Sequence, residues 1–237
     1  MENLSKLGLN IINSNKNNFK ELDINTLEKL DIRSSDPILT CSINANQTHY
    51  VTKINNIVSL DDTSSKYDLL TFRNEFNYNR QFIDFIFLKC NSVDTTVLVL
   101  GFGLGGIPLE LSLNDKVKYI DCIDNNICMF KLYNTLISEK PQKLHYYLID
   151  AKEYIIHTSK TYDIIIDDVF HFSDKIFYDF ESAARKLNNN GWLLINMYDY
   201  SNYLKYEKNL KKIFNRIIVD TTQNICVFCQ KTKYAPR

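Results

Sequence analysis

The stretch Val97-Leu-Val-Leu-Gly101-Phe-Gly103-Leu-Gly105-Gly106 decides the fold class of this chain. Its four aliphatic residues predict a buried strand, and the glycines that follow at once predict a tight turn. Pro108 indicates that a helix begins just beyond the turn, because the missing N–H of proline is harmless in a first helical turn. A strand, a glycine-rich turn and a helix in this order are typical of a nucleotide-binding unit, in which a ligand lies against bare backbone.

From this turn onward, short apolar runs alternate with helix-like segments. We expect strands at residues 96–100, 118–123, 144–148, 162–166, 192–197, 216–220 and 225–230. We expect helices at residues 107–113, 126–137, 151–156, 175–187 and 202–214, with the asparagines at 188–190 stopping the fourth. This alternation predicts an α/β fold with a doubly wound, mostly parallel sheet. Since only residues 221–224 separate the last two runs, which is too short for a crossover, the last strand should be antiparallel.

The first part of the chain follows a different pattern. Residues 38–60 alternate loosely and contain the pair Asn55-Asn56, which suits a hairpin turn, so we expect a small N-terminal β element. Residues 61–66 read as a polar loop, and residues 74–89 as a buried helix. With 237 residues the chain is too short for two full α/β domains. We therefore divide it into an N-terminal extension, 1–70, and a nucleoside-binding domain, 71–237.

Composition excludes several classes of partner. Lys plus Arg and Asp plus Glu number 28 each, so the chain lacks the basic excess that a long nucleic-acid interface needs, and we expect no nucleic-acid partner. No run approaches the roughly 20 apolar residues of a membrane span, so we expect no membrane partner. The six cysteines are scattered, which favours free thiols and a cytoplasmic location. The single C-x-x-C, Cys226 to Cys229, has no second pair or nearby His, so we expect no metal site.

Acidic residues follow three successive strands of the predicted sheet. Asp124 lies 23 residues after Gly101, close to the spacing of a ribose-binding acid, while Asp150 and Asp168 end the next two strands. Because the carboxyl ends of parallel strands meet at one edge, these carboxylates should gather there. Three acidic positions are more than a nicotinamide-dependent dehydrogenase requires. They suit a single nucleoside held at its ribose and base, with a catalytic or substrate-binding acid beside it. A purely structural turn, with Asp124 as a helix cap, is the alternative.

Residues 70 to 200 resemble the class I S-adenosylmethionine-dependent methyltransferase fold, and within it the spermidine synthase-like branch. The segment Asn74-Glu-Phe-Asn-Tyr78 is similar to the Asp-Glu-Phe-x-Tyr that precedes the glycine turn in aminopropyltransferases. The turn from Gly101 to Gly106 is similar to their Gly-Gly-Gly-Asp-Gly-Gly. The resemblance implies a Rossmann-like, seven-stranded methyltransferase sheet that binds S-adenosylmethionine or its decarboxylated form.

The resemblance also assigns roles to individual residues. Asp124 matches the ribose ligand, and Asp150, followed by Ala151, matches the acid whose loop holds the adenine. Asp168 matches the acid that activates the attacking amine and is the catalytic candidate. The remaining candidates lie against the cofactor in the glycine turn or line the substrate pocket: Gly101, Gly103, Leu104 and Gly105 in the turn, Tyr78 and His171 in the pocket.

Two departures from the family pattern bear on the reaction. Leu104 stands where the aminopropyltransferases have the Asp that faces the aminopropyl ammonium, and His171 replaces the second acid of their Asp-Ser-Ser-Asp-Pro. Each change removes a charged contact to a polycation, typically worth about 1.5–3 kcal/mol. We therefore expect methyl transfer to an amine acceptor, either a small molecule or a protein, ahead of aminopropyl transfer. The third hypothesis is an inactive ligand-binding relative, and the resemblance implies a homodimer as one assembly.

Overall fold

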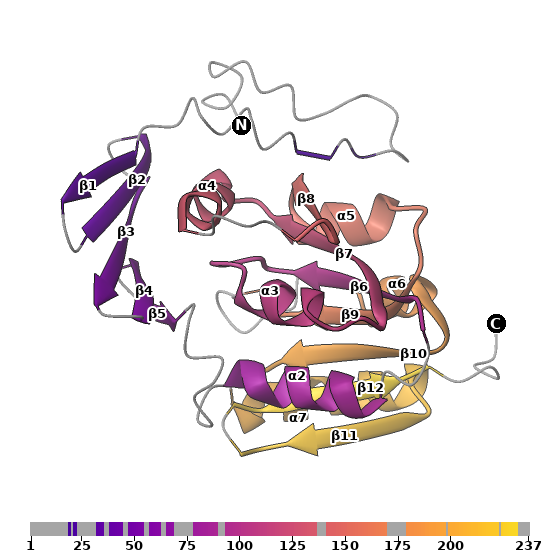
Figure 1. Cartoon of the computed structure of the whole chain (residues 1–237). Coiled ribbons are helices and arrows are strands. Elements are labelled where there is room, and N and C mark those ends of the chain that lie inside the picture. Colours follow the sequence, from indigo (N-terminus) through magenta and orange to yellow (C-terminus); the bar gives the residue numbers. More distant parts are fainter. Residues whose placement is uncertain are drawn as a thin grey trace.

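The computed structural model describes residues 19, 21–22, 32–35, 38–44, 47–54, 57–62, 65–68, 78–89, 93–136, 141–169, 179–197, 199–222 and 224–231. For the described residues between 32 and 68, and for Tyr78 and Leu136, the structure describes the backbone alone. Within this part of the chain the strands form two separate sheets, one of five strands and one of seven (Figure 1).

The N-terminal sheet is an antiparallel meander whose strands pair in chain order. Its strands are β1 (Ile32–Ser35), β2 (Ile38–Asn44), β3 (Gln47–Ile54), β4 (Ile57–Asp62) and β5 (Ser65–Asp68). Ile54 pairs with Ile57, so the small β element is confirmed, whereas the predicted turn residues Asn55-Asn56 lie outside the described residues. The predicted loop at 61–66 is wrong, because Asp61 pairs with Lys66 in the β4–β5 ladder. Backbone pairing prevails there over the polar side chains.

The seven-stranded sheet has the order β11-β12-β10-β9-β6-β7-β8. Its strands are β6 (Thr95–Leu100), β7 (Val117–Asp124), β8 (Leu144–Leu148), β9 (Tyr162–Asp167), β10 (Leu187–Asn196), β11 (Arg216–Asp220) and β12 (Cys226–Gln230). The pairs among β6 to β10 are parallel, whereas β12 runs antiparallel to both β10 and β11. The predicted α/β fold with an antiparallel last strand is confirmed, and β12 lies inside the sheet rather than at its edge.

Helices cover both faces of this sheet, and a separate hydrophobic cluster lies under each set (Figure 1). One face carries α2 (Tyr78–Lys89), α3 (Gly106–Ser112) and α4 (Ile127–Leu136); the other carries α5 (Ala151–His157), α6 (Phe180–Arg185) and α7 (Tyr200–Ile213). Strand alternation explains the division, since Val97 and Val99 belong to the first cluster, whereas Leu98 and Leu100 belong to the second. All four side chains are fully buried.

The asparagine run before Gly191 behaves differently from the prediction. Helix α6 ends at Arg185, and residues 188–190 already belong to β10 instead of stopping a helix. The pairing of β10 with β9 shifts register between Leu187 and Trp192, and Asn190 has a φ of 64°. Asparagine tolerates this left-handed conformation, so the run forms an irregularity inside the strand.

Two composition-based expectations bear on the described residues. None of the described helices is long and apolar enough to cross a membrane. The cysteines at 122, 128, 226 and 229 are buried free thiols, as expected. Cys226 and Cys229 lie in the clusters on opposite faces of the sheet, so this C-x-x-C does not act as a pair.

Candidate nucleoside-binding site

The glycine turn brings the ends of β6 and β9 into backbone contact. Gly101 has a φ of 84°, and a Cβ atom there would lie 2.5 Å from the carbonyl oxygen of Asp168. The Asp168 N–H donates to the Leu100 carbonyl (2.9 Å), and the Gly101 N–H donates to the Ile123 carbonyl (2.9 Å). Only glycine permits this approach, so Gly101 fixes the place of Asp168 relative to the turn.

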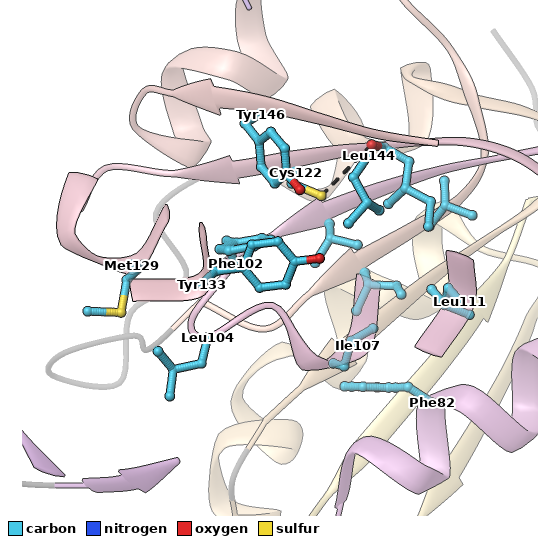
Figure 2. Close-up of a cluster of buried hydrophobic side chains, with 14 of the residues drawn as sticks. Phe82, Phe102, Leu104, Ile107, Leu111, Cys122, Met129, Tyr133, Leu144 and Tyr146 are labelled. Carbon is cyan, nitrogen blue, oxygen red and sulfur yellow. Dashed lines mark hydrogen bonds between the residues drawn. The ribbon is translucent and has the colours of Figure 1, made fainter. Parts of the chain in front are cut away.

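The far end of the turn is clamped against aromatic rings. Gly105 has a φ of 80°, and a Cβ atom there would lie 2.5 Å from the Tyr133 ring and 2.6 Å from the Phe102 ring. Leu104 is 4% exposed and belongs to the same hydrophobic cluster as these rings (Figure 2). The side chain of Leu104 therefore contributes to the packing beneath the turn.

Gly103 differs from Gly101 and Gly105. Its φ is 52°, and within the described part of the chain no atom beyond its two chain neighbours lies within 4 Å of where its Cβ would stand. The turn is thus packed at both ends and open in the middle. This open position is where a ligand can lie against bare backbone, as the sequence pattern predicts.

Asp124, the predicted ribose ligand, lies against the open part of the turn. Its Oδ2 accepts hydrogen bonds from the N–H groups of Phe102 (3.0 Å) and Gly103 (3.2 Å), and its Oδ1 accepts one from Asn126 N–H (2.8 Å). Burial raises the pKa of Asp124 to about 6, although the N–H donors, led by that of Asn126, act in the opposite direction. Asp124 therefore shapes the glycine turn as well as lying at the proposed ribose position.

Asp150 and Ala151 come to the same edge from the next strand. Ile149 N–H donates to the Asp124 carbonyl (3.0 Å), which ties the end of β8 to the end of β7. The exposed Asp150 caps α5 by accepting hydrogen bonds from Lys152 N–H (2.9 Å) and Glu153 N–H (3.3 Å). Ala151 is the first residue of that helix.

Asp168 lies on the other side of the turn, directly after β9. It is half-buried, and its Oδ1 accepts a hydrogen bond from the Asn196 Nδ2 at 3.0 Å. The neighbouring Asp167 is fully buried and accepts a hydrogen bond from Val169 N–H at 3.2 Å. The ends of four adjacent strands thus bring Asp150, Asp124, the glycine turn and Asp168 together along one edge of the sheet.

The pocket candidates are less fully described. Tyr78 is the first residue of α2, where the structure describes its backbone alone, and His171 lies outside the described residues. Among the described residues no group of three or more His, Cys, Asp or Glu is placed to hold a metal ion. Sequence reasoning missed Gln81 and Asn224. Asn224 is hydrogen-bonded both to Gln81 and to Asn196, and Asn196 donates to Asp168. The predicted hairpin between the last two strands was the available signal for Asn224.

No family model matches the chain. One curated relative, a polyamine aminopropyltransferase of Alkaliphilus oremlandii (strain OhILAs), is 27% identical over 158 residues. This match covers 63% of the chain and only 55% of the relative's own length.

Solved structures resemble the chain over more of its length. A spermidine synthase in complex with the transition state analogue AdoDATO has a TM-score of 0.62 at 13% identity, covering 85% of this chain and 73% of that one. An S-adenosylmethionine-dependent O-methyltransferase from Thermotoga maritima has a TM-score of 0.58 at 10% identity, covering 87% of each chain. The chain has the class I S-adenosylmethionine-dependent methyltransferase fold.

The predicted resemblance to the spermidine synthase-like branch of this fold is confirmed. The fold itself does not distinguish the two reactions, since the synthase and the methyltransferase have nearly equal TM-scores of 0.62 and 0.58. The curated relative is an aminopropyltransferase, so aminopropyl transfer fits the comparisons better than the methyl transfer expected from Leu104 and His171.

Proposed function

We propose that this protein is a transferase that binds an adenosyl sulfonium compound across the glycine turn and transfers an aminopropyl group to an amine. The observation that carries the proposal is the arrangement at Gly103, where an open backbone position lies beside the carboxylate of Asp124. A ribose hydroxyl can donate to this carboxylate while the adenine lies toward Asp150 and Ala151. The residues present therefore fit the nucleoside.

Asp168 would supply the chemistry on the acceptor side. The nitrogen of the acceptor attacks the carbon bonded to the sulfonium, the carbon–sulfur bond breaks and its electron pair stays on sulfur. The attacking amine must be neutral, and Asp168 accepts the proton that the nitrogen loses. Because the sulfonium already activates the carbon, the protein mainly supplies alignment and exclusion of water.

Methyl transfer from S-adenosylmethionine is the second candidate, and Leu104 favours it. A leucine cannot neutralise an aminopropyl ammonium, whereas it tolerates the carboxylate of the intact donor. Leu104 is buried in the cluster below the turn, so its side chain adds no contact to the ligand. Its effect on the choice of donor is that this position carries no negative charge, unlike the Asp of the aminopropyltransferases.

Calorimetry with S-adenosylmethionine, its decarboxylated form and S-adenosylhomocysteine tests the proposal. We expect the decarboxylated form to bind most tightly, and we expect Asp124→Asn to weaken it about 10- to 100-fold, the range for loss of a charged hydrogen bond. Asp115→Asn, on an exposed turn, is the matched control. Failure of all three compounds to bind the wild-type protein would exclude the proposal.

Turnover with short aliphatic diamines separates the two reactions. Aminopropyl transfer releases methylthioadenosine, whereas methyl transfer releases S-adenosylhomocysteine. Asp168→Asn should lower the rate far more than the donor affinity. Binding of the donor without either product, over a panel of diamines and proteins, would favour the inactive relative.

Leu104→Asp tests the residue that distinguishes the donors. The new carboxylate should shift the ratio of affinities toward the decarboxylated form about tenfold, through its charge below the turn rather than through a direct contact. Leu104→Asn controls for lost packing, since it is equally small and polar but uncharged. An unchanged ratio in both variants would exclude Leu104 from donor selection.

A further inference from the structure

The antiparallel strand β12 brings a hairpin to the reactive edge of the sheet. Asn196, the last residue of β10, pairs with Cys226, the first residue of β12. The connection from β11 to β12 therefore lies at the carboxyl end of β10, the end at which Asp168 also lies (Figure 1). Helix α2 packs on β12, so its first turn reaches the same hairpin.

A directed chain of amide hydrogen bonds runs from Asp168 into this hairpin. The fully buried Asn196 donates from Nδ2 to Asp168 Oδ1 (3.0 Å), and its Oδ1 accepts a hydrogen bond from Asn224 Nδ2 (3.2 Å). An ionised carboxylate only accepts, so the NH2 group of Asn196 must face Asp168 and its oxygen must face Asn224. Asn224 is then required to donate.

Gln81 of α2 fixes Asn224 in turn. Asn224 N–H donates to Gln81 Oε1 (3.3 Å), while Gln81 Nε2 donates to the Asn224 carbonyl (3.4 Å) and to Thr222 Oγ1 (2.9 Å). A backbone N–H can only donate and a carbonyl can only accept, so the orientation of the Gln81 amide is determined. The two hydrogen bonds to one residue hold the backbone of the hairpin against the helix.

The titratable neighbours in the described part of the chain suit this arrangement. Burial, followed by the carboxylates of Asp168 and Asp220, raises the pKa of the Cys226 thiol. The thiol therefore stays protonated and donates to Gln81 Oε1 at 3.4 Å. Asp167, the other acid beside Asp168, is directed to Val169 N–H.

We propose that Asn224 and Gln81 are positioning residues for Asp168, which they hold in place by orienting the Asn196 amide. A carboxylate held at one oxygen by a buried amide cannot rotate freely, so its remaining oxygen keeps one direction at the edge of the sheet. Its use in transfer rests on the proposed function, whereas the hydrogen-bond chain does not.

Titration of the Asp168 carboxyl carbon by NMR, in ¹³C-aspartate-labelled protein without ligand, tests this inference. Asp168→Asn assigns the signal. Asn224→Leu should raise the pKa of Asp168 by about half to one pH unit, because a loosened amide stabilises the ionised form less. Asn209→Leu, the same substitution at an exposed position on α7, should leave it unchanged.

A double variant tests whether the effect passes through Asn196. Asn196→Leu alone should raise the pKa of Asp168 by about one pH unit or more, since it removes the donor itself. Adding Asn224→Leu to Asn196→Leu should then change nothing further. Gln81→Leu should act like Asn224→Leu and serves in its place if that variant does not fold.

The inference is overturned if Asn224→Leu and Gln81→Leu leave the Asp168 titration unchanged, or if the rise persists undiminished beside Asn196→Leu. The calorimetric test of the proposed function is independent of this result. If Asn224→Leu raises the pKa of Asp168 but no donor binds, the positioning role of the amides is supported and the proposed transferase function is excluded. If a donor binds but the variants leave the pKa of Asp168 unchanged, the proposed function is supported and the positioning role is excluded.

Discussion

Gly101, Gly103 and Gly105 of the turn meet three different surroundings, which makes them separable by mutation. A Cβ at Gly101 would collide with the Asp168 backbone, one at Gly105 would collide with two rings, and one at Gly103 would enter open space. All three have a positive φ, so any substitution also strains the backbone.

Gly101→Ala and Gly103→Ala should therefore fail in different ways. We expect Gly101→Ala to lower the free energy of unfolding by about 3 kcal/mol or more, from strain plus a backbone clash. Gly103→Ala should cost only the strain, about 1–2 kcal/mol, yet weaken donor binding. Urea denaturation and calorimetry measure the two effects. Equal losses of stability would contradict the packing described here.

The titration of Asp124 should appear in the stability of the protein. Its pKa is raised from 3.8 to about 6, so the folded protein holds this proton more tightly than the unfolded chain does. The contribution of this group to stability is therefore largest below pH 4 and falls as the pH rises through 6, by up to about 3 kcal/mol. In Asp124→Asn this fall should disappear, which urea denaturation at pH 4 to 7 can measure.

Donor binding should have the opposite pH dependence. A ribose hydroxyl donates best to the ionised carboxylate of Asp124, so the affinity should decrease as the pH falls through about 6. Calorimetry between pH 5 and 7.5 measures this. A flat profile would show that Asp124 only shapes the turn.

At the scale of elements, a buried polar cluster ties α5 and β9 to the middle of β7. The fully buried Asp121 accepts hydrogen bonds at Oδ2 from Tyr162 (2.6 Å), Tyr154 (3.2 Å) and Lys160 (2.8 Å). Burial raises the pKa of both tyrosines, which keeps their hydroxyl groups protonated as donors. Asp121 thus serves the packing of elements, and Asp124 alone of these two acids reaches the glycine turn.

Tyr162→Phe should destabilise the protein by about 1.5–3 kcal/mol, because it removes a buried donor to a charged acceptor. Tyr203→Phe is the matched control, since the Tyr203 hydroxyl donates to the surface carboxylate of Glu207 at 3.0 Å. It should cost less than about 1 kcal/mol. The free energies of unfolding from urea denaturation compare the two variants, and equal values would contradict the role of Asp121.

Elements defined by local pattern were predictable from the sequence. The apolar runs gave the strands of the large sheet, since a buried parallel strand needs such a run regardless of its neighbours. The misread segments are polar stretches that belong to strands: Asp61 pairs with Lys66 through the backbone, whereas residues 188–190 form the irregularity within β10. The short connection between the last two strands was a signal for Asn224, but its contact with Gln81 was not predictable, because it joins residues 143 positions apart in the chain.

At the scale of the whole molecule, residues assigned to the N-terminal extension lie against the large sheet. Leu22 N–H donates to the Tyr146 carbonyl on β8 (2.6 Å), and Phe19 stacks on Tyr154 with ring centroids 5.0 Å apart. Glu21 lies 3.1 Å from the Nδ1 of His145. The division at residue 70 thus remains a prediction, with these contacts crossing it.

Deletion of residues 1–70 tests that division. We expect the seven-stranded sheet to persist but to unfold at a lower urea concentration, with a loss of about 1–3 kcal/mol from the apolar area uncovered. Leu22→Ala in the full chain should account for part of this loss. Circular dichroism and urea denaturation measure both. An unfolded product would show that the two parts form one folding unit.

The inner position of β12 has a consequence for synthesis. A ribosome makes residues 226–230 after every other strand of both sheets, yet β10 and β11 have no direct partnership without them. Until this segment emerges, β11 has no strand to pair with and Asn196 has no partner on β12. The sheet edge around Asp168 would form late and all at once, so premature termination near residue 220 should yield a product for proteases rather than a folded protein.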